Sequence, residues 1–202
     1  MRRSVPRPAP GRYRLWILFA AGVLLSALVA GILGAAALPE AVRRQVESSL
    51  VLPEGPPPAG PGLLPAALRR NLVESAGLAW LLGLSLAGLP LIWVVLFWRG
   101  FELGFAAAFV WGWAGNGRWT ALLALVPHNL LALPALCLLA VATARFSAAL
   151  LRSLLQGRPP PRARLLADGL TAIAATLVLT GASYVEAYVT PQVVALSLRL
   201  LP

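Results

Sequence analysis

Residues 97–134 read FWRGFELGFAAAFVWGWAGNGRWTALLALVPHNLLALP, and this stretch decides the class of fold. It is almost wholly apolar, yet it contains the ionisable residues Glu102 and His128. A water-soluble domain rarely places so many large apolar residues in series. A bilayer accepts them but makes ionisable side chains costly. The stretch therefore indicates a membrane protein.

Composition supports the same class. The chain has 202 residues, of which 59% are hydrophobic and 12% charged, and its net charge is +10. At roughly 20 residues per span, this length accommodates about five membrane-spanning helices. The arginines flank apolar runs, as expected for membrane topology, so the positive charge does not indicate nucleic-acid binding. We predict an all-α, polytopic membrane helical bundle in contact with the lipid bilayer.

The first apolar run, Leu15–Leu38, is expected to be an uncleaved span that follows a basic cytoplasmic segment, residues 1–14. The run is longer than the roughly 7–15 apolar residues of a signal peptide, although Ala35–Ala37 leave cleavage as an alternative. Residues 15–202 are predicted to form one integral membrane domain. Its extracytoplasmic Pro-rich loop, 39–70, is either a docking surface or a connector.

Two further single spans are expected. Leu72–Leu96 is predicted as the second span, with Glu74 at its outer boundary and a kink at Pro90. Leu165–Tyr188 is predicted as the last span, and the tail after it has the pattern of an amphipathic helix on the membrane surface.

A short or broken helix pair is expected between these spans, around 101–134. A helix over Phe101–Trp113 would be only about 20 Å long, less than the ~30 Å hydrocarbon core, which makes it short or re-entrant. The following apolar run is too long for one straight span, and Pro127 and Pro134 are expected to break it. His128 and Asn129 are expected to satisfy backbone groups that the prolines free.

The arginines also predict orientation. With five spans and a cytoplasmic N-terminus, eleven arginines lie inside and six outside when Arg99 is counted as inner. The positive-inside rule then places the basic loop 147–164 in the cytoplasm and the C-terminus outside.

Catalytic and metal sites are not expected. The chain has one His and one Cys, so neither a two-histidine metal motif nor a disulfide is available. No Ser and acid stand near His128 in a pattern that suggests a triad. We predict no catalytic residue, no metal and no cofactor, and a protein that is not an enzyme.

Several residues in the apolar segments are nevertheless candidates for structural or functional roles. Gly100 and Gly104 form a G-x-x-x-G pair, which is either a packing seam or a chance occurrence. Glu102 follows Arg99 by three residues, so a helical ion pair is available near the cytoplasmic interface. Glu186 is expected near the outer end of the last span. Structural roles are favoured over an ion or proton path for these groups.

Three short elements follow one another along the chain: Leu89-Pro90 with Arg99–Phe105 (RGFELGF), then Pro127–Pro134 (PHNLLALP), then Glu186–Pro191 (EAYVTP). In this order and spacing they resemble the stage II sporulation protein M family. His128 stands where the family more often has glutamine, and the Pro-rich insert is not a family signature. The candidate structural and interaction residues are Pro90, Arg99, Gly100, Phe101, Glu102, Gly104, Phe105, Pro127, His128, Asn129, Pro134, Glu186, Tyr188 and Pro191.

The resemblance implies a non-enzymatic membrane scaffold of the sporulation engulfment complex. In that family the protein lies in the septal membrane on the mother-cell side and anchors stage II sporulation proteins D and P, which degrade peptidoglycan. One alternative is a permease-like component of a transport system, because transporters often build their binding sites from broken helices. The other is a receptor-like anchor for another envelope machine. Self-association stays open.

Overall fold

A computed structural model describes residues 10–49, 60–85, 88–112, 117–157 and 159–200, and all regular structure among them is helical. This confirms the predicted all-α class for the described part of the chain. The elements are α1 (Pro10–Ala36), α2 (Glu40–Ser49), α3 (Leu64–Leu68), the π-helix η1 (Arg69–Gly77), α4 (Leu78–Leu84), α5 (Gly88–Trp111), α6 (Gly117–Gln156), α7 (Arg162–Tyr184), the π-helix η2 (Val185–Val189) and α8 (Thr190–Leu200).

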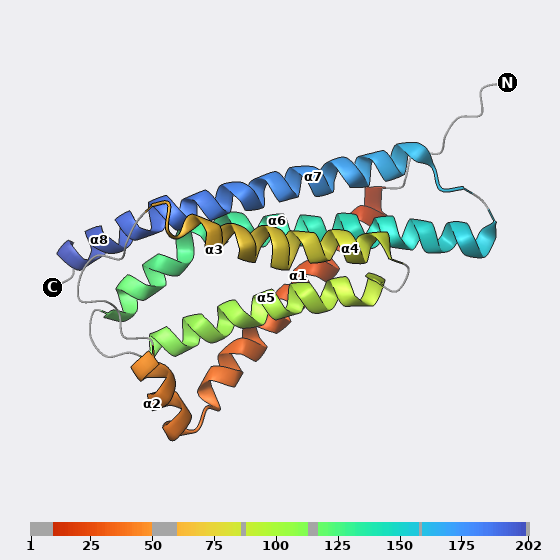
Figure 1. Cartoon of the computed structure of the whole chain (residues 1–202). Helices are drawn as coiled ribbons and strands as arrows, with labels where there is room; N and C mark the ends of the chain where they lie inside the picture. The colour runs from red at the N-terminus through yellow and green to blue at the C-terminus, as the bar shows by residue number, and fades with distance from the viewer. Residues whose placement is uncertain (1–9, 50–59, 86–87, 113–116, 158, 201–202) are drawn as a thin grey trace.

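The long helices lie side by side and reverse direction from one to the next (Figure 1). In the described residues, 4 helical stretches are long and apolar enough to cross a membrane: 13–36, 88–111, 122–156 and 162–197. The unbroken helical stretch α3–η1–α4 lies beside them as one more rod. The start of α1 and the end of α8 lie at opposite ends of the bundle (Figure 1). The polytopic bundle is therefore confirmed.

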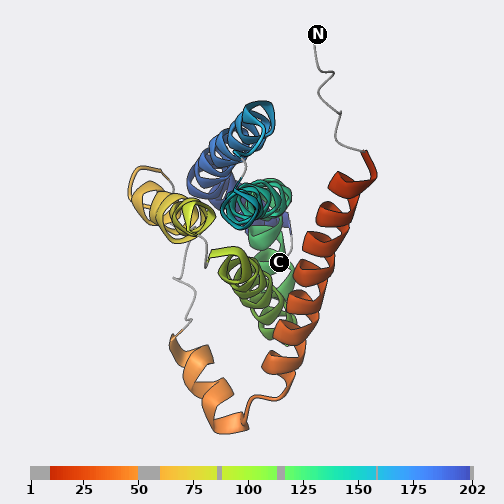
Figure 2. The same ribbon diagram turned by 90° about the vertical axis from the view of Figure 1, so that its right-hand side faces the viewer.

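The interior of the bundle is built largely from small residues. Its buried cluster is rich in alanine, and Ile92, Leu139 and Leu179 are its largest fully buried side chains. Small residues let helix backbones approach closely, which is how membrane helices associate when lipid is as apolar as the side chains. Figure 2 shows α6 and α5 at the centre, with α1 on one flank and the α3–η1–α4 rod on the other. Large apolar side chains cover the outer surface.

The span predicted at Leu72–Leu96 is wrong, because the chain reverses inside it. Ser85 is extended after α4, and the Gly88 N–H donates to the Ser85 carbonyl at 3.2 Å. A Cβ on Gly88 would collide with the Leu82 carbonyl, so only glycine fits this reversal. Pro90 lies in the first turn of α5, where a missing N–H breaks no helical bond and causes no kink.

The short or re-entrant helix expected from Phe101 is also wrong. Since α5 begins at Gly88, it has 24 residues and is about 36 Å long, enough to cross the hydrocarbon core. The sequence pattern failed here because Leu72–Leu96 was interpreted as a single helix, which assigned residues 88–96, the first part of α5, to the wrong span.

The helix predicted to break at Pro127 and Pro134 is continuous. α6 has 40 residues with both prolines inside it, and Figure 1 shows its first part inclined to the rest. Each proline removes one backbone hydrogen bond, which bends the helix without ending it when neighbouring helices hold it in place. α6 ends at Gln156 and is followed by Gly157, whose φ of 60° is the left-handed conformation that favours glycine after a helix end.

The predicted loops are shorter than expected. Helix α3 begins at Leu64, inside the predicted 39–70 loop, and α6 and α7 occupy most of the predicted 147–164 loop. The tail is helical as predicted, but α8 continues α7 in line (Figure 1). The basic residues of 1–9, the Pro-rich run at 53–59, and Gly115 and Asn116 lie outside the described residues.

Candidate functional site

A cluster of charged side chains lies halfway along the bundle, where α5 faces η1. Arg99 is at its centre and is only 12% exposed. Its Nε donates to Ser75 Oγ at 2.8 Å, its Nη2 to the Arg70 carbonyl at 2.6 Å, and its Nη1 to Glu102 Oε2 at 2.8 Å. The forked guanidinium therefore joins two helices and one carboxylate at once, which a lysine ammonium could not do in the same geometry.

The two carboxylates of this cluster lie on its outer side. Glu102 Oε1 accepts a hydrogen bond from Trp98 Nε1 at 2.7 Å, and Glu74 pairs with Arg69 at 3.1 Å and with Arg99 at 3.8 Å. The Glu74 and Glu102 side chains are 46% and 44% exposed. The cluster thus has a buried Arg99, two half-exposed carboxylates, and an exposed Arg69 that pairs with one of them.

The π-helix η1 contributes several of the polar groups that form hydrogen bonds around this cluster. In η1, the Arg70 carbonyl accepts from both Ser75 Oγ and Arg99, and Asn71 donates to Ser183 Oγ of α7 at 3.0 Å. A π-turn adds one residue to a helix and shifts the backbone pairing, so it redirects side chains, and such turns often occur at functional sites.

The second π-helix, η2, is tied to the first by an ion pair between Arg70 and Glu186. The Glu186 side chain is 21% exposed and faces the bundle. Its predicted place near the outer end of the last span had suggested that it faces water. The Gly60 N–H donates to the Ala187 carbonyl of η2 at 3.1 Å, which fixes the end of the Pro-rich loop on this same segment.

His128 lies in the bent part of α6 and is buried at 7% exposure. Asn129 Nδ2 donates to the Leu125 carbonyl at 2.7 Å and is 3.0 Å from His128 Nε2. In this arrangement Nε2 is the acceptor, so a neutral imidazole would carry its proton on Nδ1. Nδ1 and the Glu186 Oε2 atom are both buried and without a hydrogen-bond partner among the described residues.

The role predicted for His128 and Asn129 is therefore only partly correct. Asn129 does bond to local backbone, but to the Leu125 carbonyl. The prolines at 127 and 134 free the carbonyls four residues earlier, at Leu123 and Leu130, so a different group is satisfied.

Glu74, Arg99 and Glu102 were misplaced along the membrane normal. Glu74 was expected at the outer boundary and the Arg99–Glu102 pair near the cytoplasmic interface. Glu74 lies at the middle of the Leu64–Leu84 rod, and Arg99 and Glu102 lie in the middle third of α5. The i, i+3 ion pair itself is confirmed. When Arg99 is left out of the count, the predicted cytoplasmic side still has more arginines than the outer side.

The G-x-x-x-G pair is a packing seam. A Cβ on Gly104 would collide with the Leu28 carbonyl of α1, and a Cβ on Gly100 would lie 2.7 Å from Ala27 Cβ. Gly31 of α1 meets the Phe101 carbonyl in the same way. Phe101 stacks on Phe105 at a ring distance of 6.1 Å beside this seam. The seam holds α1 against α5 and leaves the opposite side of α5 to the Arg99 cluster.

A second charged cluster lies towards the other end of the bundle. Asp168 of α7 is 4% exposed and pairs with Arg145 of α6 at 3.1 Å and with Arg164 at 3.8 Å. The Arg145 guanidinium lies 4.6 Å from the centre of the Tyr13 ring of α1. The sequence analysis missed Asp168, although the i, i+4 spacing from Arg164 is a detectable signal. This cluster ties three helices together.

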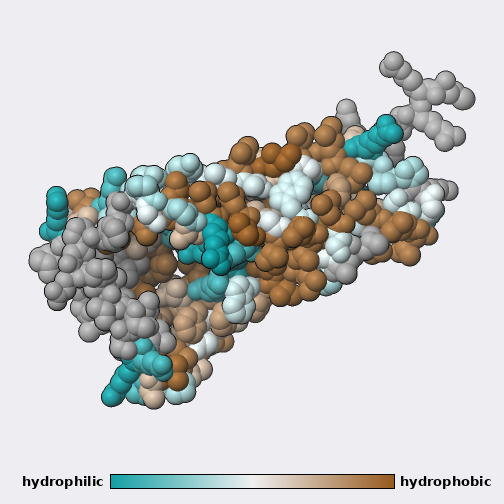
Figure 3. All heavy atoms as spheres, viewed as in Figure 1, coloured by the Kyte–Doolittle hydropathy of each residue, from teal (hydrophilic) through white to brown (hydrophobic). Residues whose placement is uncertain are grey.

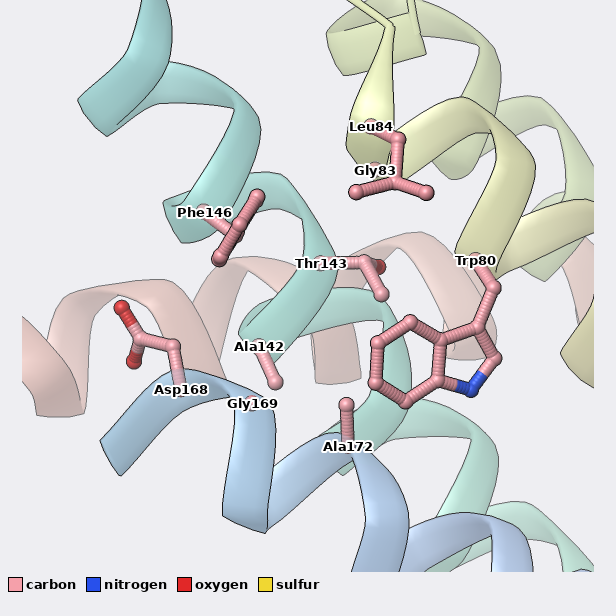
Figure 4. A pocket seen from close by; sticks show the side chains of 9 residues that line it. All are labelled: Trp80, Gly83, Leu84, Ala142, Thr143, Phe146, Asp168, Gly169 and Ala172. Carbon is pink, nitrogen blue, oxygen red and sulfur yellow. The ribbon is translucent and has the colours of Figure 1, made fainter. Parts of the chain in front are cut away.

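A small cavity between α4, α6 and α7 is too small for a ligand (Figure 4). It has a volume of about 10 Å³. That volume holds at most one water. Among the described residues, no group of three His, Cys, Asp or Glu side chains is placed to hold a metal ion.

The structure brings together only some of the predicted residues. Arg99 and Glu102 are in contact, and so are His128 and Asn129. Tyr188 stacks on Tyr184 at 6.2 Å, and Pro191 is buried at the start of α8. Arg70 was missed because the predicted second span began at Leu72, which placed Arg70 outside the membrane. Ser75 was missed because its contact with Arg99 depends on tertiary packing.

A family model described as stage II sporulation protein M matches residues 15–191. No curated protein and no solved structure matched the chain in the corresponding comparisons. The match covers most of the chain and includes all three sequence elements that carry the resemblance. Together with the apolar bundle, it establishes a sporulation membrane protein. The chain belongs to the stage II sporulation protein M family.

Proposed function

We propose that this protein is a non-enzymatic scaffold of the sporulation engulfment complex, which anchors peptidoglycan-degrading proteins at the septal membrane. The observation that carries the proposal is the family match over residues 15–191. The charged cluster around Arg99 supports it, because outward-facing polar groups in an apolar belt are typical of surfaces that contact other membrane helices.

The chemistry of the polar groups also favours a structural role. Arg99, Arg70 and Arg145 each pair with a carboxylate from the same bundle, and these pairs tie helices to one another. A catalytic pair would need a nucleophile beside a base, and buried ion pairs do not supply one.

The proposed partners are stage II sporulation proteins D and P, and the proposed location is the mother-cell side of the septum. The N-terminus would be cytoplasmic and the C-terminus extracytoplasmic. On that orientation α2 and the start of α3 lie on the extracytoplasmic side, where wall-degrading domains act, and Gly60 links this side to η2.

A permease-like component is the second candidate, and a specific feature favours it. His128 Nδ1 and Glu186 Oε2 are buried without partners in the described part of the chain, within a bent helix and a π-turn. Buried ionisable groups at such breaks are what transporters use to bind ions.

Affinity purification of the tagged full-length protein from membranes of its own host in early sporulation tests the proposal. Co-purifying proteins would be identified by mass spectrometry, with an unrelated tagged multi-pass protein as the control. The scaffold proposal predicts specific recovery of two peptidoglycan-degrading membrane proteins. Reproducible recovery of an ATPase in their place, with the wall enzymes present in the extract, would contradict it and favour transport.

A further inference from the structure

The Arg99 cluster opens onto a groove on the flank of the bundle. The groove lies between the α3–η1–α4 rod and α5, and its volume is about 310 Å³. Figure 3 shows a hydrophilic patch at this place in the middle of a largely hydrophobic flank. Its lining combines aliphatic side chains with the charged cluster: Glu74, Leu78, Val94, Val95, Trp98, Arg99 and Glu102.

The groove offers hydrogen-bond acceptors to whatever enters it. Arg99 is 12% exposed, and its guanidinium already donates to Ser75, to the Arg70 carbonyl and to Glu102. The carboxylates of Glu74 and Glu102 are nearly half exposed. Carboxylates accept several hydrogen bonds each, so Glu74 and Glu102 can accept from a further donor besides Arg69, Arg99 and Trp98.

The depth of the groove makes these anions costly if lipid covers them. Glu102 lies in the middle third of the apolar helix α5, and Glu74 lies at the middle of the neighbouring rod. A charged side chain at the centre of a bilayer is strongly unfavourable unless it faces protein or water. A protein that covers the groove with a matching donor would relieve this cost.

We propose that the groove binds a membrane-spanning helix of a different protein, and that this helix carries a basic or amide side chain near its midpoint. The inference rests on the proposed scaffold function and names its docking surface. Leu78, Val94 and Val95 would contact the apolar side chains of the incoming helix, and its donor would reach Glu74 and Glu102.

Charge argues against a second copy as the occupant. In a two-fold symmetric pair the same patch meets itself, so two grooves would bring the Glu74 and Glu102 carboxylates of both copies together. The Arg99 guanidinium is buried behind them, and the exposed Arg69 already pairs with Glu74 at 3.1 Å. An occupant that brings its own donor fits better.

The test uses a designed probe, so that it does not depend on the natural partners. The probe is a tagged single-pass helix of about 20 leucines with one central Arg, and its matched form has Leu at that position. Each is expressed with the full-length protein, and the amount co-isolated in mild detergent is measured. We expect about tenfold more recovery with the Arg probe, a difference of the size that one matched ion pair in a dry site provides.

Two substitutions in the full-length protein locate the binding surface. Val94→Trp fills the groove at a side chain that is 59% exposed, without touching an ion pair, and Leu177→Trp makes the same change at a 67% exposed position on α7. V94W should reduce recovery of the Arg probe to the level of the Leu probe, and L177W should leave it unchanged. Membrane levels and elution profiles of both variants serve as folding checks.

Equal recovery of the two probes by the wild-type protein would overturn the proposal, as would full recovery of the Arg probe by V94W. Conversion of a self-associated form to a monomer by V94W, with probe binding unchanged, would assign the groove to a second copy and would also overturn it. Loss of wall enzymes from the natural complex with the probe still bound would instead reject the scaffold function alone.

Discussion

At the scale of single residues, the account depends on Arg99. It lies in the middle third of the apolar helix α5 and connects that helix to η1 through Ser75 and the Arg70 carbonyl, while its Nη1 donates to Glu102. A charge at this depth is tolerable because its partners surround it, and removing one partner leaves the other uncompensated.

Replacing Arg99 by Lys keeps the positive charge but removes the planar guanidinium, whose N–H groups point in several directions. Arg99→Lys should lower the free energy of unfolding by about 2–3 kcal/mol, since one ammonium cannot reach all three acceptors. Unfolding in mixed micelles with increasing dodecyl sulfate measures this. Arg152→Lys, at an exposed position of α6, is the control and should change stability by less than about 0.5 kcal/mol. Equal effects of the two substitutions would show that the Arg99 geometry does not matter.

At the scale of elements, two contacts organise the bundle: the glycine seam between α1 and α5, and the ion pair between η1 and η2. The seam depends on glycines, which have no side chain to keep the two helices apart. The ion pair depends on the π-helical turns that carry Arg70 and Glu186. Each gives a prediction with a control from the same chain.

The glycine seam predicts opposite effects for two chemically identical changes. Gly104→Ala places a methyl against the Leu28 carbonyl, so α1 must move and stability should fall by about 1–3 kcal/mol. Gly181→Ala on α7 meets nothing within 4 Å and should stabilise the helix by up to about 1 kcal/mol. Thermal melting followed by size-exclusion chromatography compares them. A stable Gly104→Ala variant would mean that the seam is not close-packed.

The ion pair predicts coupling between the two π-helices. A double-mutant cycle with Arg70→Gln and Glu186→Gln should give a coupling energy of about 1–3 kcal/mol. The same cycle at Arg44 and Glu40, whose side chains are 76% and 71% exposed, should give about 0.3–0.5 kcal/mol or less. Coupling at the first pair no larger than at the second would contradict a structural tie between η1 and η2.

At the scale of the whole molecule, the rods run back and forth, so the start of α1 and the end of α8 lie at opposite ends of the bundle (Figure 1). Four of these rods qualify as membrane spans in the described residues, and the α3–η1–α4 rod would have to be the fifth of the passages expected from the sequence. The sequence pattern could predict α1 and α7, because each is a long apolar run with basic flanks.

The middle of the chain could not be divided correctly from the pattern alone. Gly88 permits a reversal that hydropathy does not detect, since the residues on both sides of it are apolar. Because of this error, Glu74 and Arg70 were placed at a membrane boundary. Their ion pairs, Glu74 with Arg99 and Arg70 with Glu186, were not predicted, because both depend on tertiary packing and on π-turns. The Arg99–Glu102 pair was predictable because it is local.

The orientation gives a prediction of its own. In a Cys137→Ala background, single cysteines replace Ala41 in α2 and Gln156 at the end of α6, both exposed positions at opposite ends of the bundle. A membrane-impermeant maleimide applied to protoplasts should label the first and label the second only after permeabilisation. Labelling of both in intact protoplasts would contradict the five-pass orientation.

Site-specific photo-crosslinking in sporulating cells tests the central claim most directly. A photoreactive amino acid replaces Val94 in the groove or, as the control, Leu177 on α7, and adducts are identified by mass spectrometry. The account predicts that Val94 crosslinks to a peptidoglycan-degrading membrane protein and that Leu177 does not. The same adducts from both positions, or adducts of Val94 with lipid alone while the partners are present, would contradict it.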